Sequence, residues 1–476
     1  MPSRQDQLHS YQYSLQRVVA ALVTHDPDPH RSPLRRAGMT ALVSLVIAAV
    51  AVGAAAVYGL ITGRSNENPR NEAVVFLEKD SGARYIYLKS DDKLHPVLNY
   101  ASGLLIANSS TPELRTTTRE RLAAVQLGAP LGIPNAPDSL PGADDLLVQP
   151  WSICTQPTGG PASDKDPRST LLVGERLTDG TLATAPGDGR PAQGLLVSDP
   201  DGRTFLVAGN RRFQIPGDRD DAVLSAFNWS DRTPWPVAAA WINSIPLGPD
   251  LKPLSIDNRG ERSGVPDADI GQLFTDGKQW KVALADGAAP ITEVQALLLK
   301  TVEGTNQGSL DGSAFINLPQ SETRLIDRGD SNALPSTLPE LAAPARSACM
   351  TLPVGADGAG LRIDPTFAAG TQATGPAAVE GGVQADWVNV ARGRGAVVVS
   401  LASPTAPAGS GTVSIVTDTG RRYSVANREV LAKLGYGGVS PQSVPAQLVA
   451  LLPQGPALDV TRARPTGTGT GDVQGN

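Results

Sequence analysis

A stretch of 23 residues without a charge, from Met39 to Ile61, constrains this chain more than any other feature of its sequence. As an α-helix rising about 1.5 Å per residue it would be about 34 Å long, enough to cross a hydrocarbon core of about 30 Å. It is preceded by 38 residues and followed by more than 400 mostly polar ones. The sequence therefore predicts a single membrane crossing with most of the chain on one side.

The residues around this stretch predict its orientation. Arg31, Arg35 and Arg36 lie within ten residues of its start, and basic residues close to a span stay cytoplasmic. We therefore expect a cytoplasmic N-terminus and an extracytoplasmic, periplasmic C-terminal part. A cleavable signal peptide is the alternative, because Ala54–Ala56 offers the small residues that a peptidase needs. However, the apolar run and the leader are both longer than in an ordinary signal peptide, which favours a retained anchor.

Composition limits the architecture and the partners of the outer part. Its roughly 415 residues correspond to two to four compact units, and the chain's 49 Gly, 40 Pro and 4% aromatic residues indicate many short elements joined by turns. Residues 1–38 hold five Arg and three Asp and therefore carry a net charge of +2. Because the whole chain carries −6, the remaining residues carry −8. A weakly acidic outer part disfavours nucleic acid as a partner.

The sequence contains two cysteines, Cys154 and Cys349, and both follow the predicted span. Thiols outside the cytoplasm are oxidised and stay so. We expect one disulfide closing a loop of nearly 200 residues, which would stabilise the fold by roughly 5 kcal/mol in the chain-entropy model. The alternative is a pair of buried free thiols.

The leader, residues 1–38, is expected to contain an amphipathic helix. Ser3 and Asp6 resemble a helix cap, and the Asp-Pro repeat at 26–29 would end the helix. A lone helix cannot bury its own apolar stripe, so we expect it to dock on a partner protein, the inner membrane surface being the alternative. Apolar residues recur at spacings of three and four along this face: Leu8, Tyr11, Leu15, Val18, Val19 and Leu22.

Beyond the span, four segments share a turn pattern in which an aromatic residue follows a glycine by three positions. An acidic residue precedes each glycine by one or two positions, so the pattern predicts a β-hairpin whose glycine adopts a positive φ. The uneven spacing of the copies, 120, 75 and 143 residues, excludes a regular solenoid. The glycines are Gly82, Gly202, Gly277 and Gly420, and the aromatic residues are Tyr85, Phe205, Trp280 and Tyr423.

The second and fourth copies also continue alike. Residues 238–245 are followed by Pro-Leu-Gly-Pro and residues 446–452 by Pro-Gln-Gly-Pro, which we interpret as short apolar helices ended by proline. Residues 427–435 predict another helix, with an asparagine cap and a terminal glycine.

These patterns predict an α+β protein: one N-terminal transmembrane helix and an elongated ectodomain of about four small α/β repeat modules around an irregular β-rich central domain. The expected divisions are a leader at 1–38, the span at 39–61, module 1 at 62–150, central segments at 151–190 and 305–405, module 2 at 191–260, module 3 at 261–304, module 4 at 406–464 and a disordered tail at 465–476.

Catalytic signals are almost missing from the ectodomain. Its single histidine, His95, would have to serve any Ser-His-Asp site, and an ordinary surface or turn histidine before Pro96 is the simpler interpretation. No two His or Cys stand at metal-ligand spacing, and no Gly-x-x-x-x-Gly-Lys run precedes Ser or Thr. The sequence therefore predicts no catalytic residue, no metal site and no cofactor.

In its segments and their order, the chain resembles the EccB family, the single-span core membrane component of mycobacterial type VII (ESX) secretion systems. The resemblance covers essentially the whole chain and rests on residues 7–13, 17–23 and 31–39, the degenerate outer repeats and the two distant cysteines. It implies four similar outer repeats and a central domain braced by a disulfide. It also implies an inner-membrane complex with EccC, EccD and EccE, in which EccC is the motor ATPase, a mycosin protease nearby, and self-association of the ectodomain.

The main functional prediction is therefore a structural core subunit of a secretion channel. The alternative is a membrane-anchored extracytoplasmic enzyme, either an ATPase, as family members have been labelled, or an envelope hydrolase. The sequence does not favour the ATPase, because it lacks a nucleotide motif and ATP is scarce outside the cytoplasm.

Overall fold

The computed structural model describes residues 3–24, 33–62, 68–157, 166–183, 192–326, 333–344, 346–352, 359–377, 381–403, 406–407 and 410–464. The expected helix stop at 26–29 and the tail at 465–476 lie outside the described residues.

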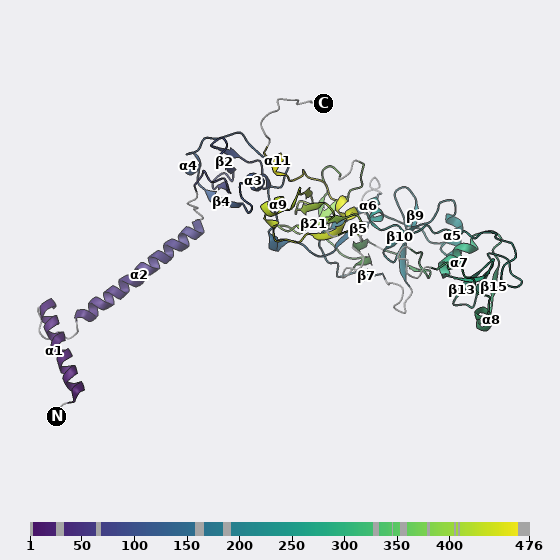
Figure 1. Cartoon of the computed structure of the whole chain (residues 1–476), viewed down its shortest axis with the longest axis horizontal. Helices are drawn as coiled ribbons and strands as arrows, with labels where there is room; N and C mark the ends of the chain where they lie inside the picture. Colours follow the sequence, from purple (N-terminus) through teal and green to yellow (C-terminus); the bar gives the residue numbers. More distant parts are fainter. Residues whose placement is uncertain are drawn as a thin grey trace.

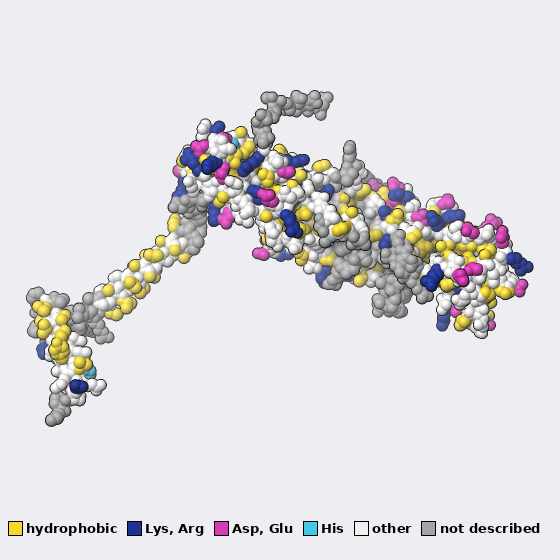
Figure 2. Space-filling model, in the orientation of Figure 1, with side chains coloured by type: hydrophobic (Ala, Val, Ile, Leu, Met, Phe, Trp, Pro, Cys, Tyr) yellow, Lys and Arg dark blue, Asp and Glu magenta, His cyan; other side chains and the backbone are white. Residues whose placement is uncertain are grey.

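Two long helices precede the ectodomain (Figure 1), α1 (Arg4–Thr24) and α2 (Pro33–Thr62). Ser3 and Asp6 cap α1 reciprocally: the Ser3 N–H donates to Asp6 Oδ2 at 3.0 Å, and the Asp6 N–H donates to Ser3 Oγ at 3.3 Å. In α2, Gly38–Tyr58 is long and apolar enough to cross a membrane, and apolar side chains cover its surface (Figure 2). The prediction of one N-terminal apolar helix is confirmed.

The ectodomain contains four modules with one sheet topology. In each, the first strand pairs antiparallel with the second and parallel with the fourth, and the third strand pairs with the second. The third strand therefore forms one edge of the sheet and the fourth strand the other.

Short helices accompany the strands of each module. Module 1 contains β1 (Val74–Glu78), β2 (Arg84–Leu88), β3 (Lys93–Pro96), α3 (Tyr100–Ile106), β4 (Glu113–Thr117), α4 (Arg119–Leu122) and η1 (Ala143–Asp145). Module 2 contains β8 (Gln193–Ser198), β9 (Thr204–Ala208), β10 (Arg211–Gln214), α5 (Asp220–Ala226), β11 (Trp235–Pro236), α6 (Ala239–Ser244) and the later strand β16 (Glu340–Leu341).

Modules 3 and 4 repeat this plan. Module 3 contains β12 (Leu273–Thr275), β13 (Trp280–Leu284), β14 (Gly287–Ile291), α7 (Glu293–Lys300), β15 (Gln307–Ser309) and α8 (Gly312–Ile316). Module 4 contains β21 (Ala396–Leu401), β22 (Val413–Val416), β23 (Arg422–Ser424), α9 (Arg428–Leu431), the π-helix η2 (Ala432–Tyr436), β24 (Gln442–Pro445), α10 (Ala446–Ala450) and α11 (Val460–Ala463). The predicted short helices near 238–245, 427–435 and 446–452 are thus present as α6, α9 with η2, and α10.

A central seven-stranded sheet joins the modules, because the chain crosses it twice. Three of its strands come from the segment between modules 1 and 2, and four come from the segment between modules 3 and 4. Their spatial order is β19-β20-β6-β5-β17-β18-β7. They are β5 (Trp151–Gln156), β6 (Arg168–Leu172), β7 (Thr181–Leu182), β17 (Ala348–Leu352), β18 (Gly360–Ile363), β19 (Thr371–Gln372) and β20 (Trp387–Asn389).

This path places modules 1 and 4 at one end of an elongated ectodomain and module 3 at the other (Figure 1). One apolar core contains Val75 and Ile86 of module 1 together with Ile415 and Tyr423 of module 4. Another joins module 2 to α7 of module 3 through Val294 and Leu298. The α+β fold class and the elongated arrangement of modules are confirmed.

Several divisions expected from the sequence differ from the sheets. Strand β21, in the stretch expected to be central, begins the sheet of module 4. Strand β15 and helix α8, beyond residue 304, complete module 3. The returning strand β16 joins module 2. The reason is that strand pairing is set by contacts distant in the sequence, which composition does not report.

Candidate functional site

All four predicted turn glycines adopt the left-handed conformation, with φ of +70° at Gly82, +78° at Gly202, +88° at Gly277 and +72° at Gly420. However, they do not occupy one position in the repeat. The first three join the first and second strands of their modules, whereas Gly420 joins the second and third strands, β22 and β23. The predicted hairpin turns are present, but in the fourth copy the turn closes a different hairpin of the repeat, because similar Asp/Gly turns suit both hairpins.

The structure instead reveals a repeated device that the sequence patterns missed. A later segment, which we call the strap, runs beside the third strand of each module and closes that edge of the sheet. In each case the N–H of one strand residue donates to the carbonyl of the first strap residue, and the carbonyl of the same strand residue accepts from the N–H of the third strap residue. These distances are 2.7–3.2 Å. The straps are residues 126–128, 246–248, 319–321 and 453–455, and their strand partners are Leu94, Arg212, Ala288 and Arg422.

In three straps the third residue is a glycine. It lies against the aromatic ring of the strand residue that follows the hydrogen-bonded one. A Cβ added at Gly128, Gly248 or Gly455 would come within 3.0 Å of the ring of His95, Phe213 or Tyr423, respectively. Only glycine therefore lets these straps approach closely enough to form their backbone hydrogen bonds.

Module 3 reverses this arrangement, with Ala289 on the strand and Ser321 on the strap. A small strand residue leaves room for a strap side chain. The signal in the sequence is a spacing of 32 to 35 residues within the pairs His95–Gly128, Phe213–Gly248, Ala289–Ser321 and Tyr423–Gly455. The two Pro-x-Gly-Pro runs, expected to end helices, belong to the straps.

Both ring nitrogens of His95 have a partner within its own module. It lies buried in β3, with Nδ1 2.8 Å from the carbonyl oxygen of Ala129 and Nε2 3.0 Å from Asp91 Oδ2. The prediction of a surface or turn histidine was wrong, because both ring nitrogens are held inside the module. Among the described residues, no group of three or more His, Cys, Asp or Glu could hold a metal ion.

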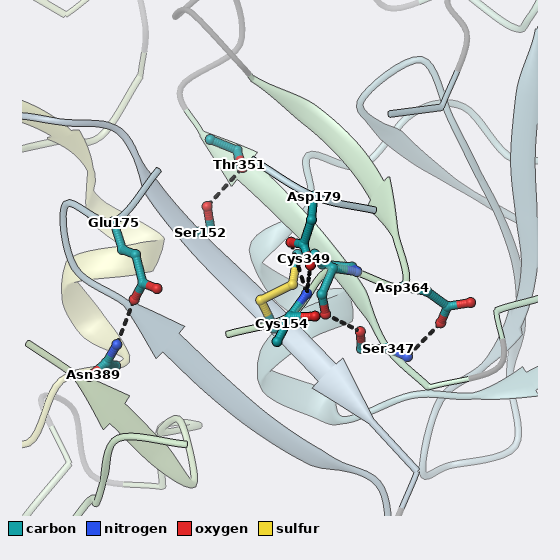
Figure 3. Close-up of a disulfide and its surroundings, with 11 residues drawn as sticks. Ser152, Cys154, Glu175, Asp179, Ser347, Cys349, Thr351, Asp364 and Asn389 are labelled. Carbon is teal, nitrogen blue, oxygen red and sulfur yellow. Dashed lines mark hydrogen bonds between the residues drawn. A yellow bond between two sulfur atoms is a disulfide. The ribbon is translucent and has the colours of Figure 1, made fainter. Parts of the chain in front are cut away.

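The outgoing and returning halves of the chain are covalently joined within the seven-stranded sheet, by a disulfide that Figure 3 shows in close-up. Cys154 of β5 and Cys349 of β17 face each other in register and form a disulfide, with their Cα atoms 4.0 Å apart. Both cysteines are fully buried, and the Ser152 and Thr351 hydroxyls hydrogen-bond beside them at 2.7 Å. The predicted disulfide is present and links strands that are 195 residues apart.

A second connection between chain ends holds module 1 to module 4, and we call it the clasp. Lys433 Nζ donates to the carbonyl of Ala107 at 2.7 Å, and Arg464 donates to the carbonyl of Ile106. Both carbonyls lie at the C-terminal end of α3, where helix carbonyls lack intrahelical partners. Burial, followed by the charge of Arg464, lowers the pKa of Lys433.

Tyr436 completes the clasp. Its hydroxyl donates to the carbonyl of Pro141 at 2.7 Å, and its side chain is 1% exposed. Burial raises the pKa of this phenol far above its ordinary value. The module nearest the span is thus fixed to the C-terminal module by residues more than 290 positions away.

The predicted stripe on α1 is largely uncovered. Leu8, Tyr11, Val18 and Leu22 are each more than half exposed, and Leu15 is 49% exposed. Val19 is half-buried.

The architecture has known counterparts. A family model described as "Type VII secretion system ESX-1, transport TM domain B" matches residues 1–468. The ESX-3 secretion system ATPase EccB3 of Mycobacterium tuberculosis is 28% identical, with 95% of this chain and 87% of the relative aligned. The ESX-1 secretion system ATPase EccB1 of the same organism is 24% identical, with 95% and 92% aligned.

Solved structures agree along nearly the whole chain. A chain of an intact ESX-5 inner membrane complex superposes with a TM-score of 0.64 at 23% identity, covering 97% of this chain and 95% of that chain. A chain of the EccB3 dimer from the ESX-3 core complex superposes with a TM-score of 0.60 at 25% identity, covering 82% and 99%. The family match and the shared fold show that this chain belongs to the EccB family of type VII secretion system proteins.

Proposed function

We propose that this protein is a structural core subunit of an ESX inner membrane complex, with one membrane span and an ectodomain that contributes to the periplasmic assembly. The observation that carries the proposal is the family match over residues 1–468. In this fold a strap closes one sheet edge of each module, the disulfide joins the two halves of the central sheet, and the clasp holds module 1 to module 4. Rigidity and surface area, rather than a reactive centre, are what this arrangement supplies.

The proposed orientation places the N-terminus in the cytoplasm. Arg35 and Arg36 flank the span on its N-terminal side, and basic flanks stay cytoplasmic. The disulfide supports the same orientation, because such bonds persist on the oxidising side of the membrane. Protease treatment of intact spheroplasts tests it: the ectodomain should be degraded, and full protection would refute the orientation.

Isolation of the native complex tests the structural role. Affinity purification from detergent-solubilised membranes should recover EccC, EccD and EccE subunits with this chain, together with a second copy of it. Deleting the gene should abolish both the complex and export of ESX substrates. A chain that migrates alone on native gels, in cells whose export survives its deletion, would overturn the proposal.

We assign the leader helix to a protein partner within that complex, EccC or EccD, because its apolar stripe is exposed. Leu15→Asp and Val18→Asp place a charge on the stripe, whereas Gln16→Asp places one on an already polar, exposed position of the same helix. The first two variants should lower recovery of the partners at least about tenfold, and the third should not. Equal recovery from all three would exclude the stripe as a docking surface.

Relatives of this chain are named ATPases, and that name gives the second candidate function. It remains the less favoured one, because the sequence contains no P-loop and its single ectodomain histidine is bound on both nitrogens. Hydrolysis measured on full-length protein, before and after removal of contaminating ATPases, distinguishes the two. Turnover that survives the clearance would establish the enzyme.

A further inference from the structure

The straps leave each module with one sheet edge for pairing with another chain, the edge formed by the fourth strand. In module 2 the returning strand β16 pairs with β8 on that side. In module 4, β24 meets module 1, where Gln442 Nε2 donates to the carbonyls of Val148 and Gln149 at 3.1 and 3.0 Å. Among the described residues, β4 of module 1 and β15 of module 3 have no such neighbour.

Of these two edges, β4 is the better template for another strand. Strand β15 has three residues with Gly308 at its centre, whereas β4 has five. The Lys79 N–H donates to the carbonyl of Thr117 at 3.1 Å, so residues 113, 115 and 117 direct their backbone groups toward β1 in the parallel ladder. Leu114 and Thr116 therefore direct their N–H and C=O groups outward.

The side chains of β4 match a second copy of the same strand. Glu113 and Arg115 lie on one face of β4, with side chains 60% and 46% exposed, and contact each other. Leu114 lies between them in the sequence, on the opposite face of the strand, and is 37% exposed. In an antiparallel pair centred on Leu114, each Glu113 would stand opposite an Arg115 of the other copy.

We propose that β4 pairs antiparallel with β4 of a second copy of this chain, with the two Leu114 residues opposite each other. The inference rests on the self-association that belongs to the proposed function, and it names the surface. The two Leu114 residues would exchange both backbone hydrogen bonds, and each Glu113 would form a cross-strand ion pair with an Arg115 in the adjacent, more closely spaced position.

A second copy fits this edge better than an unrelated strand. Edge strands that avoid pairing typically carry charged side chains, lysine above all, or proline. In β4 the two charges are opposite and stand on either side of an apolar residue, so they complement themselves under two-fold rotation. Strand β4 also belongs to the first module after α2 (Figure 1). Two copies anchored in one membrane would therefore present it at the same height.

Cysteine cross-linking of the full-length chain in membranes tests the pairing. The chain has no free cysteine among its described residues, and the sequence contains only the two that form the disulfide, so Leu114→Cys supplies a unique thiol. Opposed residues of an antiparallel pair have Cα atoms about 5.5 Å apart, within disulfide range. We expect oxidation to give a dimer that reductant removes, and Ile316→Cys on α8, which is 70% exposed, to give none.

Charge exchange separates this interface from a chance collision. In the Leu114→Cys background, Glu113→Arg or Arg115→Glu alone creates like-charged cross-strand pairs and should lower the cross-linked fraction about tenfold. The double exchange restores opposite charges and should restore the dimer, as should co-expression of the two single variants with different tags. Failure of both rescues would overturn the proposal.

Light scattering of the purified full-length protein distinguishes failure of this inference from failure of the proposed function. If the protein is dimeric but Leu114→Cys cross-links no better than Ile316→Cys, self-association stands and β4 is excluded as its interface. A monomer at all concentrations would refute both.

Discussion

The strap glycines make the most direct test of this fold, and Gly455→Ala in module 4 is the sharpest case. The added Cβ would fall within 3.0 Å of the Tyr423 ring, which is 4% exposed. The strap cannot retreat without losing its two hydrogen bonds to Arg422, at 3.1 and 2.8 Å. Overpacking of this kind costs about 1–3 kcal/mol. We expect a Tm about 1–4 °C lower for the full-length protein in detergent, followed by circular dichroism.

A matched control and a rescue accompany this variant. Gly438→Ala, in the same module, has nothing within 4 Å of the new Cβ and should leave the Tm nearly unchanged. Module 3 supplies the rescue, because it pairs Ala289 with Ser321 where module 4 pairs Tyr423 with Gly455.

The rescue is measured by a double-mutant cycle. Tyr423→Ala alone should cost about 3–5 kcal/mol through the cavity it leaves. Gly455→Ser should destabilise the wild type but be neutral or stabilising beside Tyr423→Ala, which gives a coupling of at least about 1 kcal/mol. An additive cycle, or equal Tm values for Gly455→Ala and Gly438→Ala, would refute the reasoning.

Three further predictions concern the disulfide and the clasp. Replacing both Cys154 and Cys349 by alanine should lower the free energy of unfolding by roughly 5 kcal/mol, which an unchanged Tm under non-reducing conditions would contradict. Lys433→Met leaves the buried Ala107 carbonyl without its donor and should lower the free energy of unfolding by about 1–3 kcal/mol. Amide hydrogen exchange in α3 should become faster in this variant. It should stay unchanged in the control Arg428→Met, at the exposed start of α9. Tyr436 has a raised pKa in the folded state, so its contribution is complete below the unfolded pKa of about 10 and is lost as the pH rises through the folded pKa. Tyr436→Phe should remove this alkaline loss of stability in urea titrations, and identical pH dependence in the two proteins would exclude Tyr436 as its source.

Local chemistry determined what the sequence could predict. The apolar run predicted α2, and the Ser3/Asp6 pair predicted the start of α1. The Asn427 side chain caps α9 by accepting from the Val430 N–H at 2.9 Å, and Gly435 has a φ of +94° near the end of the following π-helix. These features depend on residues close in the sequence, so pattern and propensity suffice.

Features that join distant residues escaped prediction. Gly420 carries the same turn chemistry as Gly202 but closes a different hairpin, and only strand pairing reveals this. The strap glycines resemble ordinary helix stops until the rings of Phe213 and Tyr423 are placed beside them. The clasp escaped for the same reason, since Lys433 and Arg464 donate to carbonyls more than 300 positions away in the sequence.

The out-and-back path of the chain explains why the module nearest the membrane depends on the C-terminus. Module 1 follows α2, yet its α3 is held by Lys433 and Arg464, and its apolar core is shared with module 4. Module 1 therefore reaches its final packing only after the chain has passed through modules 2 and 3 and returned across the disulfide-bearing sheet. A chain truncated before module 4 would leave α3 without Lys433 and Arg464 and would expose the side of this shared core that Ile415 and Tyr423 cover. It follows that only a completely folded ectodomain presents a finished membrane-proximal surface to its neighbours in the complex.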